Sequence, residues 1–394
     1  MKKNPRILII GGGFAGCASS HILTINGFED VTLVDNNSYL GSGVRTFFYG
    51  GHPYTFGPRH FLTKNKKLYE YLNKFLPMRS CSEHQFITYI EQDSEFYNLP
   101  INHQDIKKMP DKNKIYQELK NIKIIDNPEN LEEYWINNVG ITLYEKFIKN
   151  YNEKMWMIDD IKKITSFSWS TKGQPIQETS KKAFDDAISA YPIALDGYNS
   201  YFDLATKKIK VLLNTEAKVK DIKKKEFLIN NKVHQFDVVI SSISPDILFD
   251  FKFGELKYIG RDMFNIVLPV EYCLPKDVYF QYFSGKEKHT RIVEYKKLTK
   301  YKSNHTLIGI EKPSLNGKFY PLPFSNQQEL AKKYHDEFPN NFYSIGRNGT
   351  YRYGVDIDDC IEQAFKVCEN LQNNKWDYSI PLEKHRLKSF GGVS

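Results

Sequence analysis

The beginning of the chain alternates between short apolar runs and a helical repeat. Residues 7–10 and 31–34 are largely apolar, which predicts two buried strands. Between them Ala15, Ala18 and Ile22 recur at helical spacing, and Gly27 follows where the end of a helix favours a residue without a Cβ. The segment 6–35 is therefore predicted to form a βαβ unit.

The rest of the chain divides into a helical stretch and a series of strands. Apolar spacings of three and four predict that residues 64–164 are mostly helical. Strands are predicted at 210–214, 227–229 and 236–240, separated by charged turns as in a meander, and then at 264–270, 278–283, 289–295 and 305–311. The later group suggests a largely antiparallel second layer. A last strand is predicted at 341–345, and Asp356 can cap a helix that runs to about residue 370.

Composition and charge narrow the class of protein. The 394 residues, 41% hydrophobic and 26% charged, suit two globular domains or one elaborated α/β domain. The net charge of +8 is spread over lysine clusters interleaved with acids, so nucleic acid is a weak candidate, whereas a nucleotide or diphosphate fits. The five cysteines form no C-x-x-C pair and no metal spacing, which predicts a reduced, cytoplasmic setting without a metal site. No apolar run approaches the roughly 18 residues that span a bilayer.

A glycine motif follows the first predicted strand. Gly11, Gly13 and Gly16 match G-x-G-x-x-G, in which the first glycine permits a tight turn, the second admits a pyrophosphate and the third lets the helix pack on the strand. Asp35 lies nineteen residues after Gly16, where an acid accepts a ribose hydroxyl. The strand before the motif and the helix after it favour a dinucleotide site over a glycine-rich turn without a ligand.

The far end of the chain decides between NAD and FAD. In many FAD folds a late strand returns beside the first strand and directs a helix N-terminus at the flavin, and residues 346–360 fit that segment. Arg347, Arg352 and two tyrosines crowd into residues 346–353, a composition that suits phosphate recognition. The alternative is an ordinary capped surface helix. FAD is the predicted cofactor, and the predicted fold class is α/β, with an FAD-binding Rossmann-like domain, a helical insertion and an antiparallel sheet domain.

Two further residues are candidates for the site, Arg291 for phosphate recognition and His60 for catalysis, but each also has a purely structural interpretation. Arg291 stands in the middle of a predicted strand, where a solvent-facing ion pair with a nearby acid is an equal possibility. His60 follows a Gly-Pro turn, and a lone histidine is more often structural than catalytic. Because no catalytic triad, metal cluster or carboxylate pair stands out, the cofactor is expected to carry the chemistry.

The chain resembles the UDP-galactopyranose mutase family in several separated stretches that span nearly its whole length. They are residues 56–63, 99–102, 128–133, 143–156, 249–254, 289–294, 319–321 and 346–358. The resemblance implies an FAD-dependent isomerase that interconverts the pyranose and furanose forms of a nucleotide sugar through a flavin N5-sugar adduct, with reduced FAD as the nucleophile. It also implies a flavin reductant and a homodimer, without membrane insertion.

The same resemblance assigns roles to individual residues. The family's diphosphate arginine falls on Arg291, its substrate tyrosines on Tyr320 and Tyr353, and its flavin arginine on Arg347. The expected catalytic residues are Arg291, Tyr320, Tyr353 and His60, and the expected substrate-binding residues are these first three with Asn102, Tyr151 and Trp156. The expected cofactor-binding residues are Gly11, Gly13, Phe14, Ala15, Gly16, Asp35, Asn36, Gly43, Arg59, His60, Arg347, Asp356, Ile357 and Asp358.

The sequence departs from the family pattern at several points. The family's two histidines near the Gly-Pro turn fall on Arg59 and Leu62, and an arginine of the family falls on Ile259, with Arg261 two places on. The mobile loop that carries an arginine in the family has only the lysines Lys172, Lys181 and Lys182 at 165–191, and one residue, Gly354 or Val355, is inserted before the last helix. These departures leave open a sugar or nucleotide other than UDP-galactose.

Two other functions remain open, an FAD oxidoreductase of the amine-oxidase type and a flavin-binding protein without turnover. The expected division of the chain places the FAD-binding domain at 1–63, 205–250 and 336–394. A helical substrate domain is expected at 64–165, a mobile loop and connection at 166–204, and the antiparallel sheet domain at 251–335.

Overall fold

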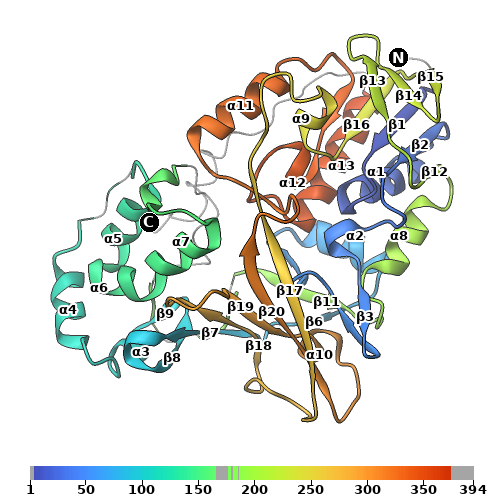
Figure 1. Ribbon diagram of the computed structural model, residues 1–394. Coiled ribbons are helices and arrows are strands. Elements are labelled where there is room, and N and C mark those ends of the chain that lie inside the picture. Colours follow the sequence, from blue (N-terminus) through green and yellow to red (C-terminus); the bar gives the residue numbers. More distant parts are fainter. Residues whose placement is uncertain are drawn as a thin grey trace.

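A five-stranded parallel sheet forms the part of the molecule at the upper right of Figure 1. The computed structural model describes residues 4–123, 125, 127–165, 176–178, 181–184 and 186–373. The strand order is β12-β2-β1-β16-β22, with bounds Lys210–Leu212, Val31–Val34, Ile7–Ile10, Val238–Ser241 and Phe342–Ser344. Every neighbouring pair is parallel. The predicted βαβ unit is confirmed, and the predicted strand at 341–345 returns two places from β1.

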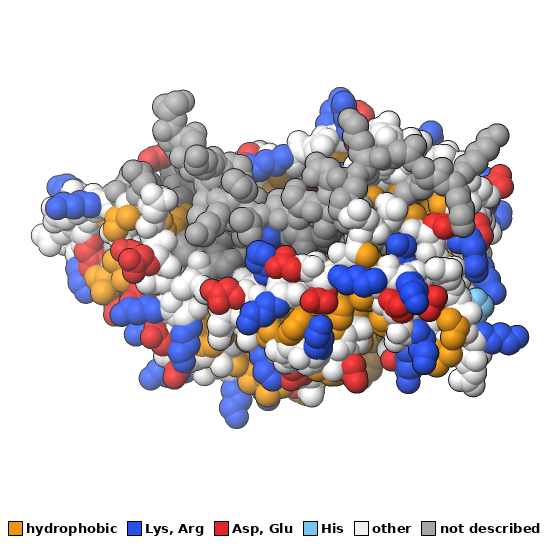
Figure 2. Space-filling model, turned by 90° about the horizontal axis from the view of Figure 1, so that it is seen from above, with side chains coloured by type: hydrophobic (Ala, Val, Ile, Leu, Met, Phe, Trp, Pro, Cys, Tyr) orange, Lys and Arg blue, Asp and Glu red, His pale blue; other side chains and the backbone are white. Residues whose placement is uncertain are grey.

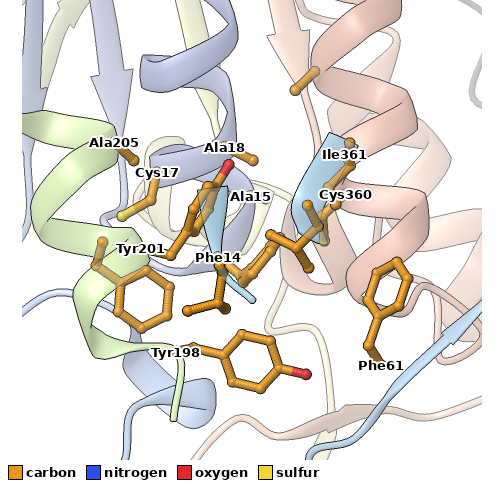
Figure 3. Packing of buried hydrophobic residues seen from close by; sticks show 14 of the residues in the cluster. Phe14, Ala15, Cys17, Ala18, Phe61, Tyr198, Tyr201, Ala205, Cys360 and Ile361 are labelled. Atoms are coloured by element: carbon orange, nitrogen blue, oxygen red, sulfur yellow. The ribbon is translucent and has the colours of Figure 1, made fainter. Parts of the chain in front are cut away.

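Both faces of this sheet are covered, which explains why β1 is apolar at every position. Ile7 and Ile9 pack into the core that contains α1 (Phe14–Ile25), α8 (Asn199–Thr206) and α13 (Ile357–Gln372). Figure 3 shows this core, where Phe14 of α1 lies between Tyr198 and Tyr201 on one side and Cys360 of α13 on the other. Leu8 and Ile10 face the opposite core, which a small antiparallel sheet covers.

That small sheet is the predicted meander, although only its middle strand was placed correctly. Its order is β13-β14-β15, with bounds Lys218–Asp221, Glu226–Ile229 and Lys232–Gln235. The flanking predictions at 210–214 and 236–240 correspond instead to β12 and β16 of the parallel sheet. These two segments are apolar at consecutive positions, as expected of strands in a parallel sheet that is covered on both faces.

A seven-stranded sheet forms the second layer, at the lower centre of Figure 1. Its order is β21-β17-β20-β19-β18-β7-β8, with bounds Tyr320–Pro321, Tyr258–Leu268, Thr306–Ser314, Arg291–Glu294, Val278–Phe283, Gln85–Ile90 and Glu95–Leu99. It is antiparallel except where β18 pairs with β7. The antiparallel layer is confirmed, but β7 and β8 come from the segment predicted to be helical. In β7 buried positions alternate with partly exposed ones, the period of a strand.

The helical lobe stands to the left in Figure 1 and has its own core. It comprises α3 (His103–Ile106), α4 (Lys112–Lys120), α5 (Leu131–Val139), α6 (Ile141–Tyr144), a π-helical turn at Glu145–Lys149 and α7 (Asn150–Trp156). Lys146, buried beside Asp93, and Lys154, whose Nζ lies 3.1 Å from Glu287, join the lobe to the large sheet. The lobe therefore holds α7 against the strands that carry Arg291.

Smaller elements connect these layers. They are the β3–β4 hairpin (Phe47–Tyr49, His52–Tyr54), a sheet of β5 (Phe61–Thr63), β11 (Ile188–Pro192) and β6 (Met78–Ser80), the pair β9 (Ile101–Asn102) and β10 (Ile176–Gln177), and the helices α2 (Lys66–Phe75), α9 (Pro245–Leu248), α10 (Tyr295–Thr299), α11 (Ser325–His335) and α12 (Gly346–Gly349). None of the described helices has the length and apolar character needed to cross a membrane. On the face shown in Figure 2, Lys and Arg side chains are interspersed with Asp and Glu.

Candidate active site

The glycine loop is held in place by its own backbone and by Asp35. Gly11 has φ +99°, which favours glycine, and a Cβ on Gly16 would lie only 1.9 Å from the carbonyl oxygen of Gly11. Close packing of α1 on β1 therefore depends on Gly16. The N–H of Gly12 donates to Asp35 Oδ2 at 2.5 Å, and the N–H of Asn37 donates to Asp35 Oδ1 at 2.7 Å. Asp35 thus fixes the loop, and Asn37 is the neighbour that lines the adjoining cavity.

A cavity of about 560 Å³ opens between this loop and the last helix. The predicted residues that line it are Gly13, Phe14, Ala15, Gly43, Arg59, His60, Arg347, Asp356 and Ile357. At one end α1 begins without a side-chain cap and without an acidic residue in its first turn, so its N–H groups suit a pyrophosphate. Gly346 lies beside this helix start, since a Cβ on it would stand 2.9 Å from the Cβ of Ala15. The two ends of the chain thus form one site.

Arg347 is fixed by the start of α13. Its NH2 group lies 2.7 Å from Asp356 Oδ1, and its Nε donates to the carbonyl of Val355 at 3.0 Å. Asp356 also forms a capping box with Asp359, so the predicted cap is confirmed. Asp358 points elsewhere, toward Thr63, and burial followed by the neighbouring carboxylates raises its pKa to about 7.

A cluster of aromatic rings and arginines adjoins the cavity through Arg347. The Arg347 guanidinium lies 5.3 Å from the ring of Tyr320 and 5.6 Å from that of Tyr353. The rings of Tyr320 and Tyr353 are 5.4 Å apart, and Trp156 meets Tyr353 edge-on at 5.0 Å. Three segments that are distant in sequence therefore converge here, as the family resemblance implies for the substrate site.

Arg291 lies in the same region and is paired. Its Nε donates to Glu311 Oε1 at 2.9 Å and its NH2 group to Glu311 Oε2 at 2.6 Å, and the exposed fractions of the two side chains are 16% and 2%. The sequence left open a solvent-facing ion pair for this arginine. The ion pair exists but is buried, and β19 and β20 hold it in register, since Arg291 stands opposite Glu311. Glu311 was not predicted from the sequence.

Positive charge around Tyr320 changes its acidity. Burial alone raises the pKa of this phenol, but Arg59, Arg261 and Arg291 together lower it to about 8. For Tyr353, burial and the nearby Tyr320 raise the pKa. Two neighbouring phenols therefore have opposite tendencies, and Tyr320 is the one that ionises close to neutral pH.

The remaining predicted residues occupy different places. His60 lines the cavity and packs against Phe184, with ring centroids 5.4 Å apart. Tyr151 of α7 is partly buried and meets Tyr282 edge-on at 5.6 Å, next to the Arg291 pair. Asn102 is buried and accepts from the N–H of Gln104, so it caps α3.

Five predicted cofactor residues do not line the cavity, namely Gly11, Gly16, Asp35, Asn36 and Asp358. Gly11 and Gly16 shape the glycine loop itself, Asp35 accepts from its Gly12 N–H, and Asn36 is exposed. Of the three loop lysines, Lys172 lies outside the described residues, while Lys181 and Lys182 are exposed.

The structure adds Arg261 to the cluster. It lies on β17, its guanidinium stands 4.6 Å from the ring of Tyr320, and its exposed fraction is 8%. Ile259, the position of the family's arginine, pairs with Tyr320 across the sheet, and Arg261 is on the same side of the strand because side chains alternate. The spacing of two residues between Ile259 and Arg261 was the signal in the sequence.

Comparison with protein-family models decides the relationship. The model described as UDP-galactopyranose mutase matches residues 146–353, more than half of the chain. The chain belongs to the UDP-galactopyranose mutase family. A second model, described as an NAD(P)-binding Rossmann-like domain, matches residues 9–75, which contain the glycine loop.

Relatives of this mutase-family chain match nearly its full length. The dTDP-fucopyranose mutase of Escherichia coli is 24% identical, with 94% of this chain and 99% of that protein covered. A probable UDP-galactopyranose mutase of Klebsiella pneumoniae is also 24% identical, with 93% and 95% covered. Among solved structures, reduced UDP-galactopyranose mutase superposes with a TM-score of 0.81 at 16% identity, over 98% of this chain and all of the other.

Proposed function

We propose that this member of the UDP-galactopyranose mutase family interconverts the pyranose and furanose forms of a sugar carried on a nucleoside diphosphate, with FAD as its cofactor. The observation that carries the proposal is that Arg347 borders two regions: it lines the cavity, and its guanidinium lies over the rings of Tyr320 and Tyr353. A cofactor in the cavity and a sugar beside the two tyrosines would meet at this arginine. The family and the relatives' names support the same reaction.

The residues around the cavity fit FAD. The uncapped start of α1 and the backbone of Gly13 suit the pyrophosphate. Arg59, whose charge also acts on Tyr320, and the first turn of α13 line the cavity as well. Arg59 is held by its Nε, which donates to the carbonyl of Gly43 at 3.1 Å. When bound and reduced, FAD supplies a nucleophile for the anomeric carbon of the sugar.

The chain's own groups position the substrate and move protons. Tyr320 and Tyr353 offer hydroxyl groups and flat ring faces to a sugar, and Trp156 closes one side of Tyr353. Because its pKa is about 8, Tyr320 can give or take a proton at neutral pH as the sugar ring opens and closes. The pairing with Glu311 fixes the Arg291 guanidinium near the rings of Phe280 and Tyr282, from where its charge acts on Tyr320.

The test is a panel of UDP-, dTDP- and GDP-sugars given to the reduced protein under anaerobic conditions, with the products analysed by NMR. A mutase forms the furanose isomer without net consumption of electrons. Stoichiometric use of an oxidant during turnover would instead establish an oxidoreductase, a function for which the fold alone leaves room, since a putative protoporphyrinogen oxidase from Exiguobacterium superposes with a TM-score of 0.70 at 12% identity. Oxidised protein serves as the matched control and should be inactive.

The finer assignments are part of the same proposal. We propose a sugar or a base other than those of UDP-galactose, because the chain departs from the family pattern at Ile259 and in the loop at 165–191. One relative at 24% identity is a dTDP-fucopyranose mutase. We also propose a separate flavin reductant, a homodimer and a cytoplasmic setting. Sedimentation of the purified protein tests the dimer directly.

A further inference from the structure

The arginines around Tyr320 differ in whether a carboxylate neutralises them. Arg291 is paired with Glu311, and Arg347 is paired with Asp356. For Arg59 and Arg261, no carboxylate oxygen lies within 4.0 Å in the part of the chain that the structure describes. Arg59 lines the cofactor cavity and belongs with FAD. Arg261 is thus the uncompensated cation of the substrate cluster.

Arg261 is buried and only partly engaged. Its NH1 group donates to the carbonyl of Gly260 at 2.7 Å, its NH2 group contacts the sulfur of Met155, and its face lies on Tyr320. A guanidinium has five N–H donors, so these two contacts leave donors for a ligand. A buried cation without a counter-ion is costly, and an anionic ligand offsets that cost.

We infer that Arg261 binds the diphosphate of the nucleotide sugar and takes the role of the arginine that the loop at 165–191 lacks. The inference rests on the proposed function for the identity of the anion. Arg261 suits it because the planar guanidinium can offer two parallel hydrogen bonds to phosphate oxygens, whereas Glu311 already occupies two donors of Arg291. Loop lysines would give a single, less directional contact.

The neighbours of Arg261 support this position. The positive charge of Arg261 acts to lower the pKa of both Tyr151 and Tyr353, so both side chains lie near it. A diphosphate at Arg261 would therefore have these aromatic rings beside it. Met155, which the guanidinium contacts, stands next to Trp156 on α7. A diphosphate at Arg261 would therefore lie between the sugar at the two tyrosines and the base near α7.

The experiment measures binding rather than turnover. The oxidised FAD-loaded protein is titrated with UDP, dTDP, UMP and dTMP by calorimetry, as wild type, Arg261→Met and Arg261→Lys. Arg261→Met should weaken diphosphate binding about tenfold to a hundredfold, since a hydrogen bond to a charged group is lost. The monophosphates should lose less, and Arg261→Lys should retain part of the affinity. Arg79→Met is the matched control, because Arg79 also lies over a tyrosine ring, Tyr191 at 5.9 Å, but away from the cluster.

Diphosphate binding by Arg261→Met within twofold of wild type would overturn the inference. If that variant does not fold, Arg261→Lys decides: an unchanged affinity for UDP and dTDP would show that the guanidinium makes no bidentate hydrogen bond to the diphosphate. Loss of FAD together with unchanged UDP and dTDP binding would assign Arg261 to the cofactor instead. If affinity falls as expected but no sugar is isomerised, the diphosphate site stands and the proposed function fails. If the wild type isomerises sugars but Arg261→Met binds diphosphates as tightly as wild type, the proposed function stands and the diphosphate site at Arg261 fails.

Discussion

Replacing Glu311 by glutamine tests whether the buried ion pair organises the substrate cluster. Glutamine keeps the size of the side chain but offers only one oxygen, so one of the two hydrogen bonds to Arg291 is lost and the guanidinium keeps an uncompensated charge. Breaking a buried pair from one side costs about 3–5 kcal/mol of folding free energy. The exposed fractions of 16% and 2% place this pair in that class.

The expected fall in melting temperature follows from the length of the chain. An unfolding entropy of about 2.1 cal/mol/K per residue gives about 0.8 kcal/mol/K for 394 residues. A loss of 3–5 kcal/mol then corresponds to a decrease of about 4–6 °C. Scanning calorimetry measures the shift, and Glu70→Gln is the control, because its exposed pair with Lys66 contributes only about 0.3–0.5 kcal/mol.

A double-mutant cycle with Arg291→Met separates the pair from its surroundings. If the two groups stabilise the fold through each other, the double variant should be less destabilised than the sum of the single variants by more than about 1 kcal/mol. Additive effects, or a Glu311→Gln shift no larger than that of Glu70→Gln, would refute the reasoning.

Gly16→Ala should abolish FAD retention, because the new Cβ would lie 1.9 Å from a backbone oxygen. Gly27→Ala is the control: its φ of +88° strains the new residue and lowers stability, but its Cβ meets no atom within 4 Å, so the flavin absorbance should be kept. Tyr320→Phe should be less stable than wild type at pH 10 but not below pH 8. The folded pKa of Tyr320 is about 8, below the ordinary 10.0, so ionisation of this phenol stabilises the wild type only as pH rises from about 8 to 10. An equal difference in unfolding free energy between variant and wild type at both pH values, measured with urea, would contradict this. Asp358→Asn should gain stability relative to wild type as pH rises from about 4 to 7. The folded pKa of Asp358 is about 7, above the ordinary 3.8, so the wild type loses folding free energy as this buried carboxyl ionises, whereas the amide does not ionise. An equal gain in Glu29→Gln, at an exposed position, would contradict this.

Local signals in the sequence were enough for the elements whose determinants lie close together in the chain. The βαβ unit, the three glycines and the cap at Asp356 each depend on neighbours within a few tens of residues, and the structure has all of them. The strands β7 and β8 were missed because their alternating pattern is short and sits among residues with helical spacing.

The chemistry of the site was decided by contacts between distant residues. The sequence determined that the chain carries a dinucleotide loop and an arginine-rich C-terminal tract, since each is a local pattern. Only the tertiary structure decided that Asp35 holds the loop, that Glu311 neutralises Arg291 and that Arg261 remains without a carboxylate partner among the described residues. The reason is physical: the charge of a site is the sum over groups that the fold brings together, and strand pairing and burial set that sum.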